Sequence, residues 1–198
     1  MSVLLISGST RGGSTNTAVL RTAVALDPDG TAWAPALAEL PAFDPDLDHD
    51  PLPPAVAALR AGLAAASGLL VCTPEYAGAL PGAMKNLLDW AVGAPEMDGK
   101  PVAWVNVASV AAPTGASGAH QELRTVLGYV GARVVEDACA RVPLSRDDVG
   151  ADGLVAAPAL REALAIALAA LGPPADGAAD RAADRAGSVA GGATGANG

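Results

Sequence analysis

The chain has 198 residues, 51% of them hydrophobic, which is the usual size of one α/β domain and enough apolar side chain to bury a core. Its formal net charge is −9 and its twelve Lys and Arg are scattered, so neither nucleic acid nor an anionic membrane is an expected partner. Neither of the two cysteines stands in a metal or redox spacing and no signal peptide is visible, so we expect a cytoplasmic, reduced setting and no bound metal.

Apolar runs and helical patterns alternate along the chain. The expected strands cover residues 3–6, 31–34, 69–72, 102–107 and 133–136, and the expected helices cover 15–26, 54–66, 82–92, 120–130 and 158–171. The alternation predicts a doubly wound parallel sheet with helices on both faces and a ligand at the carboxyl ends of the strands. The longest apolar helical stretch, at 163–171, is shorter than the roughly 20 residues of a membrane span.

A glycine-rich turn at residues 8–16 separates the first strand from the first helix. The N–H groups at a helix start have no intrahelical partners and the helix dipole is positive there, so this turn favours a phosphate. A G-x-G-x-x-G spacing is absent, and Ser14 stands where a Walker A loop has its lysine, so a monophosphate suits the turn better than ATP. The side chains expected around that phosphate are Ser9, Thr10, Arg11, Ser14, Thr15 and Asn16. The other interpretation is an ordinary strand-to-helix turn.

A second segment, residues 74–90, follows another apolar strand and leads into a helix. It reads P-E-Y-x-G-x-x-P-G-x-x-K-N-x-x-D-W, and residues 8–16 read G-S-x-R-x-x-S-x-N. With these two motifs the chain resembles the NADPH-dependent FMN reductase family of flavodoxin-like proteins, which includes quinone, chromate and azo-dye reductases. Weaker similarity continues to about residue 171.

The resemblance implies a flavodoxin-like fold with five parallel strands in the order 2-1-3-4-5 and an FMN phosphate in the first turn. It implies that Pro74, Glu75 and Tyr76 line the flavin ring, that Gly78 lets the backbone pass close to it, and that Ser109 adds a contact from the next loop. Ala77 replaces the amide of the family's usual P-E-Y-N, so a ring hydrogen bond from that side chain would fall to backbone or water.

The same resemblance implies an enzyme that takes hydride from NADPH or NADH and passes it through FMN to a quinone, free flavin or similar small acceptor in ping-pong turnover. No catalytic side chain is expected, because the cofactor carries the chemistry. A homodimer or homotetramer is implied as well. Two alternatives stay open: an FMN-binding electron carrier, and a flavodoxin-like binding protein without flavin, which Ala77 favours.

Two further segments complete the sequence. Residues 44–50 open like a calcium loop but lack its glycine and glutamate, so they predict an acidic loop. Residues 173–198 are Ala, Gly and Asp with almost no bulky apolar side chain, which predicts a disordered tail after one domain at 1–172.

Overall fold

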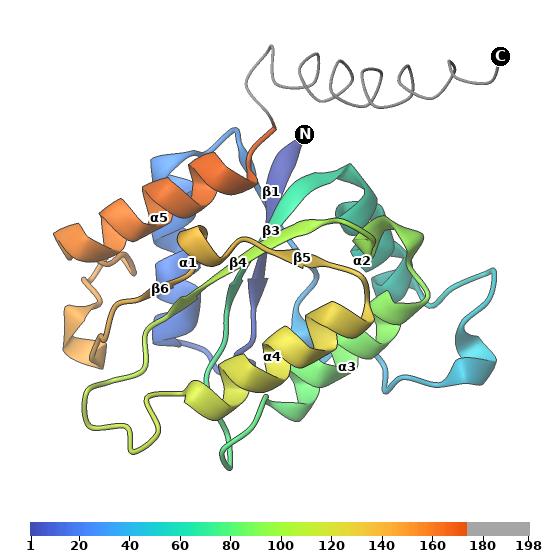
Figure 1. The fold of residues 1–198 in the computed structure, drawn as a ribbon, viewed down its shortest axis with the longest axis horizontal. Helices are drawn as coiled ribbons and strands as arrows, with labels where there is room; N and C mark the ends of the chain where they lie inside the picture. The colour runs from blue at the N-terminus through green and yellow to red at the C-terminus, as the bar shows by residue number, and fades with distance from the viewer. Residues whose placement is uncertain (174–198) are drawn as a thin grey trace, which may run out of the picture.

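The computed structural model describes residues 1–173 and shows a parallel sheet between two layers of helices (Figure 1). The strands are β1 (Ser2–Ser7), β2 (Thr31–Trp33), β3 (Ala66–Cys72), β4 (Pro101–Asn106), β5 (Arg133–Val134) and β6 (Ala140–Arg141). The helices are α1 (Thr15–Leu26), α2 (Pro54–Ala65), α3 (Gly82–Val92), α4 (Ser117–Tyr129) and α5 (Pro158–Leu171). No helix within the described residues is long and apolar enough to cross a membrane.

The sheet confirms the predicted order, β2-β1-β3-β4-β5, and adds a sixth strand. β5 is shorter than the expected 133–136, because Glu136–Ala138 forms a 3-10 turn. β5 pairs with the start of β4 at Pro101 and Val102, and β6 pairs with its end at Val105 and Asn106. One edge strand predicted from the sequence is therefore two short strands with a turn between them.

Both faces of the sheet are buried, which explains why its central strands are continuous apolar runs. Successive side chains of a strand point to opposite faces. Leu4 and Ile6 of β1 pack in the core that α2, α3 and α4 cover, whereas Val3 and Leu5 pack in the core that α1 and α5 cover. The two helix layers of Figure 1 correspond to these two cores.

The helix boundaries agree with the sequence except at α4, which begins at Ser117 and not at residue 120. Its first turn contains Ser117 and Gly118, which lack the apolar spacing of a helix, and the stabilising cap comes from a distant residue, Glu75. The predicted disordered tail lies outside the described residues apart from Pro173, and the domain boundary at 172 stays a prediction.

The long segment between β2 and α2 is fastened to α3 by side chains of the second motif. Asn86 accepts a hydrogen bond from the Phe43 N–H (2.7 Å) and donates one to the Pro41 carbonyl (2.8 Å). The indole N–H of Trp90 donates to the same carbonyl (2.9 Å). Two residues of the K-N-x-x-D-W signature therefore hold a loop in place.

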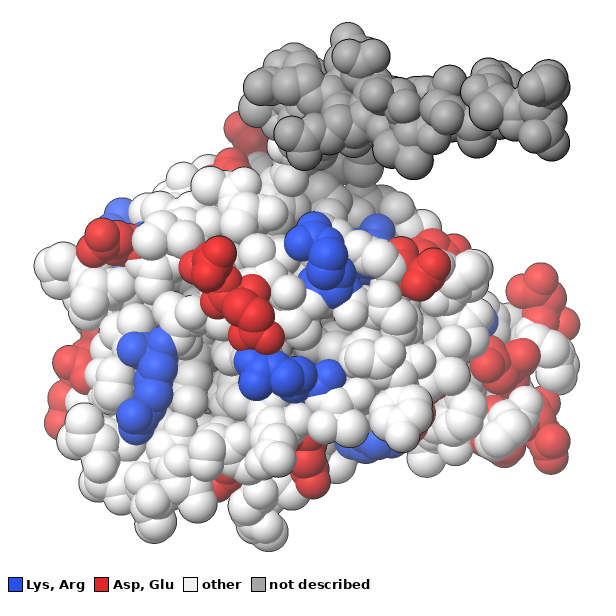
Figure 2. All heavy atoms as spheres, viewed as in Figure 1, with Lys and Arg blue, Asp and Glu red and all other residues white. Residues whose placement is uncertain are grey.

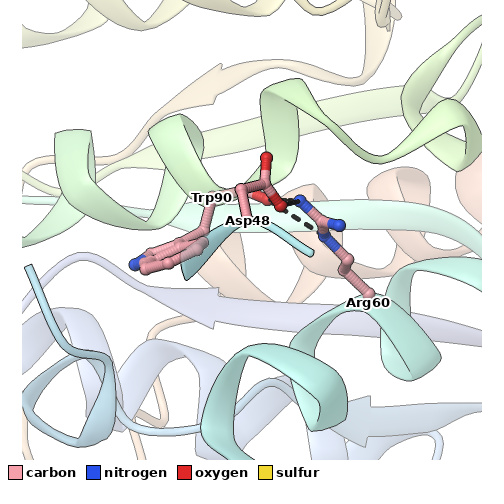
Figure 3. Close-up of polar contacts among 3 residues, drawn as sticks. All are labelled: Asp48, Arg60 and Trp90. Carbon is pink, nitrogen blue, oxygen red and sulfur yellow. Dashed lines mark hydrogen bonds and ion pairs between the residues drawn. The ribbon is translucent and has the colours of Figure 1, made fainter. Parts of the chain in front are cut away.

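A charged contact secures this segment a second time (Figure 3). Arg60 of α2 donates to the Asp48 carboxylate at 2.5 Å and to the backbone carbonyl of Trp90 at 3.1 Å. Both charged side chains are about four-fifths buried, with 18% and 20% of their side-chain area exposed. The ion pair thus joins the acidic loop at 44–50 to α2, and the hydrogen bond from Arg60 to Trp90 joins α2 to α3.

Candidate functional site

A cleft of about 480 Å³ opens at the carboxyl ends of β3 and β4, and we call it the β3–β4 cleft. Its size suits a small-molecule ligand. Four segments form its walls: the start of α1 and the loops that follow β3, β4 and β6. The lining residues are Thr15, Asn16, Thr73, Pro74, Glu75, Val107, Ala108, Ser109, Ala112, Pro113, Thr114, Ala116, Leu144, Ser145 and Arg146.

One end of the β3–β4 cleft has the groups that hold a phosphate. Thr15 and Asn16 of the first turn of α1 line the cleft, and Ser14, the N-cap residue before them, makes no side-chain cap hydrogen bond. The N–H groups of the first turn of α1 have no partners inside the helix, and the dipole favours an anion there. This end of the cleft therefore fits the phosphate of FMN.

Asn16 lies beside Cys72. The thiol of Cys72 lies 3.3 Å from Asn16 Oδ1 and 3.1 Å from the Val105 carbonyl, and its one S–H donates to one of these acceptors at a time. Burial raises the pKa of the Cys72 thiol, so the thiol stays protonated and keeps its role as a donor. Cys72 therefore connects the end of β3 to a residue that lines the cleft.

Glu75 connects three parts of the site. Its carboxylate accepts hydrogen bonds from the Thr114 hydroxyl and from the Ala119 N–H (3.1 Å) at the start of α4. The hydrogen bond from Thr114, and then those from the backbone, lower the pKa of Glu75, so it is an ionised cap at the positive end of a helix. Glu75 lines the cleft, and it also holds the opposite wall.

The loop between β4 and α4 is held in shape by two buried side chains. Asn106 donates to the Gly115 carbonyl (2.7 Å) and accepts from the Ala108 N–H (2.9 Å). His120 Nδ1 lies 2.7 Å from the Ala116 carbonyl and donates to it, and burial lowers the pKa of this imidazole. Ala116 has φ 62°, a left-handed conformation that its buried contacts maintain. This wall of the cleft is therefore preformed.

Tyr76, Ala77 and Gly78 form a tight turn beside the cleft. Tyr76 and Ala79 exchange backbone hydrogen bonds of 3.0 and 3.1 Å, and the two residues between them have φ of 53° and 78°. A two-residue turn with positive φ at both positions is a type I′ hairpin, for which Asn-Gly is the preferred sequence. An asparagine at position 77, as in the family's P-E-Y-N, would therefore favour the observed backbone conformation. This role is separate from the hydrogen bond to the flavin ring that the sequence analysis considered for that side chain.

Replacing Ala77 with Asn is expected to raise the free energy of unfolding by about 0.5–1 kcal/mol, because Asn adopts the left-handed conformation more readily than Ala. Urea denaturation of the protein without flavin measures this effect. Ala77→Val is the matched control and is expected to destabilise the protein, because a β-branched side chain is poorly tolerated at positive φ. A loss of stability in Ala77→Asn would contradict the assigned turn.

Eight of the predicted site residues line one of two clefts, and Ser14, Tyr76, Ala77 and Gly78 line neither of them. Thr15, Asn16, Pro74, Glu75 and Ser109 line the β3–β4 cleft. A second cleft of about 400 Å³ lies on the other side of the glycine-rich turn, and we call it the Trp33 cleft. Its lining residues are Ser7, Ser9, Thr10, Arg11, Gly12, Thr17 and Trp33–Ala38. Ser9, Thr10 and Arg11, all expected at the FMN phosphate, are thus placed beside Trp33.

Several lining residues of the β3–β4 cleft have no signal in the sequence. Thr114 and Arg146 belong to loops without a motif, and the short strand β6 that precedes Arg146 was not predicted. Basic side chains do not form a continuous area on the face viewed in Figure 2, where they are interspersed with acidic ones. Arg146 lines the β3–β4 cleft and so supplies a local positive charge there, although the protein as a whole is acidic.

Comparisons with known proteins agree with this geometry. The sequence profile of the NADPH-dependent FMN reductase family matches residues 1–145. An NAD(P)H-dependent FMN reductase of Pseudomonas aeruginosa is 38% identical over 131 residues, which cover 65% of this chain and 70% of that protein. A quinone reductase of Escherichia coli is 32% identical over 140 residues, covering 68% and 73%.

Solved structures give the same result. FerB, a flavoenzyme NAD(P)H:acceptor oxidoreductase from Paracoccus denitrificans, superposes with a TM-score of 0.72 at 26% identity, covering 87% of this chain and 99% of that one. A flavodoxin from Pseudomonas aeruginosa superposes with a TM-score of 0.53 at 22% identity, covering 84% and 98%, which supports the fold. By its two motifs, its sheet order and these relatives, the chain belongs to the NADPH-dependent FMN reductase family.

Proposed function

We propose that this protein is an NAD(P)H-dependent FMN oxidoreductase that delivers electrons to a quinone, free flavin or similar small acceptor. The observation that carries the proposal is the β3–β4 cleft, which combines the start of α1 with two loop walls that hydrogen bonds of Glu75 and Asn106 hold in shape. The relatives named as FMN and quinone reductases support the same assignment. The cytoplasmic location and the homodimer or homotetramer remain predictions from the sequence.

In this proposal the phosphate of FMN binds at Ser14, Thr15 and Asn16 and at the free N–H groups of α1. Pro74 and Glu75 contact the flavin from one side, and Ser109 and Thr114 contact it from the loop after β4. Tyr76, Ala77 and Gly78 form the turn that packs this wall against α4. Ionised Glu75 keeps both walls together, so the ring meets a site that is already shaped.

Bound FMN supplies the chemistry, accepting hydride from NADPH or NADH and returning the electrons to an acceptor. The protein contributes orientation, because its loops leave one open cleft that the nicotinamide and the acceptor occupy in turn, as ping-pong turnover requires. The proposed reaction needs no side chain that acts as a general acid or base. The ionised state of Glu75 and the buried, neutral setting of His120 suit positioning roles.

An absorbance titration of the purified protein with FMN, followed by anaerobic addition of NADPH, tests the proposal. We expect a bound-flavin spectrum that bleaches rapidly and recovers when a quinone is added. Bound flavin that neither NADPH nor NADH reduces would favour the electron carrier. Absence of flavin binding would leave the fold intact and overturn the function.

Replacing Ser14 with Asp is expected to weaken FMN binding by about 100-fold or more, because the new carboxylate repels the phosphate. An Asp at the N-cap can accept hydrogen bonds from the first N–H groups of α1, which offsets part of the cost of placing a charge at a position that is 3% exposed. Flavin fluorescence quenching measures the affinity and thermal melting checks the fold. Thr125→Asp, at an exposed position of α4 that does not line the cleft, is the control and should have a much smaller effect. If both substitutions weakened FMN binding equally, the phosphate would not bind at the start of α1.

A further inference from the structure

The loop that follows β6 is the wall of the β3–β4 cleft to which the proposed function assigns no part of FMN. The start of α1 receives the phosphate and the loops after β3 and β4 contact the ring, whereas Leu144, Ser145 and Arg146 line the cleft from a fourth segment. The family profile matches residues 1–145, so Arg146 lies outside the part of the chain that the profile covers. This wall is therefore free to contact a molecule other than FMN.

The backbone of this loop is held in place on both sides of Arg146. Before it, the Leu144 N–H donates to the Val107 carbonyl at 3.3 Å, and the Leu144 side chain is 8% exposed in the core that α1 and α5 cover. After it, the Asp148 carboxylate accepts hydrogen bonds from the N–H (2.6 Å) and the hydroxyl (2.8 Å) of Ser145. Arg146 is therefore presented at the cleft by a loop of fixed shape.

Arg146 carries a charge that no other side chain of the cleft neutralises. Of the lining residues, Glu75 and Arg146 are charged, and the Glu75 carboxylate accepts hydrogen bonds from Thr114 and from the first turn of α4. Asp147 and Asp148 follow Arg146 in the chain but do not line the cleft. The three ion pairs within residues 1–173 use other basic side chains, and Arg146 is exposed. A planar guanidinium in this setting favours the paired oxygens of a carboxylate or a sulfonate.

Small apolar side chains accompany this charge. Ala108, Ala112 and Pro113 line the cleft from the loop after β4, and Leu144 lines it from the loop after β6. Apolar walls with a few polar groups are typical of a site for an organic molecule, whose apolar part they remove from water. An aromatic anion matches both properties of the cleft. A small inorganic anion would leave the apolar walls uncovered, and a neutral ring would leave the guanidinium without a partner.

We propose that Arg146 is a specificity-determining residue, which selects planar aromatic electron acceptors that carry a sulfonate or carboxylate group. The aromatic part of the acceptor packs on the apolar lining of the β3–β4 cleft, and its anionic group pairs with the guanidinium. The net charge of −9 disfavours anions over most of the protein surface, so one local cation decides whether such an acceptor binds. This inference rests on the proposed function, because it names the class of acceptor for the same site.

Calorimetric titration of the oxidised, FMN-loaded protein with naphthalene-2-sulfonate and with naphthalene-2-sulfonamide tests this assignment. The two compounds have similar shapes but differ in charge, and neither is a quinone, so binding is measured without turnover. The sulfonate should bind about 5- to 30-fold more tightly, between the effect of an exposed ion pair and that of a charge-assisted hydrogen bond. At an ionic strength of about 1 M, where the Debye length is about 3 Å, this preference should become smaller.

Variants of Arg146 connect the preference to this side chain. Arg146→Gln should abolish the preference for the sulfonate, and Arg146→Lys should retain part of it, because a lysine keeps the charge but not the planar pair of donors. Arg161→Gln, at an exposed position of α5, is the matched control and should leave the preference unchanged. In steady-state kinetics Arg146→Gln should raise the KM of a sulfonated naphthoquinone by about the same factor and leave the kcat and an unsubstituted naphthoquinone unaffected.

The outcomes separate this inference from other roles of Arg146. Absence of a preference in the parent, or a preference that persists in Arg146→Gln, would overturn the assignment. A loss of FMN affinity in Arg146→Gln would place the guanidinium at the cofactor and would overturn it as well. Because the calorimetric readout is binding to oxidised protein, a sulfonate preference in a protein whose flavin neither NADPH nor NADH reduces would overturn the proposed function and leave the anion site in place.

Discussion

Replacing Trp90 with Ala is expected to lower the free energy of unfolding by about 3–5 kcal/mol, the usual cost of removing a large buried aromatic side chain. Trp90 is 0% exposed, and its ring lies edge to face with Phe43 at a centroid distance of 4.9 Å. Its indole N–H also satisfies the Pro41 carbonyl, which would lose one partner. Urea denaturation followed by circular dichroism measures the loss.

Trp90→Phe separates the two contributions of this residue. Phenylalanine keeps most of the ring contact with Phe43 but cannot donate to Pro41, so its cost should be smaller, at about 1–3 kcal/mol. A loss below about 1 kcal/mol in Trp90→Ala would contradict the role assigned to Trp90 in the core.

The alternation of strands and helices was predictable because each central element is long and buried on a regular face. Helix α1 was placed at the residues observed, and β3 and β4 were located by their apolar runs. The strand order needed the family resemblance, since periodicity within a segment carries no information on neighbours. The split of the outer strand into β5 and β6 was missed, because a two-residue strand has no periodicity to detect.

The candidate site was predictable where its residues are contiguous in the chain. The glycine-rich turn and residues 74 and 75 were identified from motifs, and Thr15, Asn16, Pro74 and Glu75 do meet in one cleft. Arg146 and Thr114 come to the same cleft from loops whose course depends on tertiary packing. The residues of the turn line two clefts, with Arg11 in the Trp33 cleft, and their expected place at the FMN phosphate stays a prediction.

The start of α4 is a further case in which tertiary contacts decide local structure. A reading of helix propensity places the first turn later, because Gly118 is a poor helix former. The carboxylate of Glu75 and the packing of the Tyr76–Ala79 turn against Gly118 stabilise that first turn from outside the helix. Gly118 is therefore required for close approach, which sequence reasoning from one chain could not show.

Replacing Gly118 with Ala is expected to lower the free energy of unfolding by about 1–3 kcal/mol, as overpacking does, and to weaken FMN binding by about tenfold or more. A Cβ at this position would overlap the Gly78 carbonyl oxygen and come within 3.0 Å of Glu75 Oε2. Since the overlap is with backbone, α4 or the Tyr76–Ala79 turn must move, and the hydrogen bonds of Glu75 that join the two cleft walls would lengthen.

Gly128→Ala is the matched control in the same helix, because a Cβ there meets no atom within 4 Å. This substitution should raise the free energy of unfolding by about 0.5–1 kcal/mol through helix propensity and leave FMN affinity unchanged. Thermal melting and flavin fluorescence quenching of the two variants, compared side by side, separate helix propensity from close packing. If both variants changed stability and FMN affinity alike, the contact between Gly118 and Gly78 would not shape the β3–β4 cleft. If Gly118→Ala lost stability and FMN affinity while Gly128→Ala gained stability and kept its affinity, flavin binding would depend on the close approach of α4 to the Tyr76–Ala79 turn.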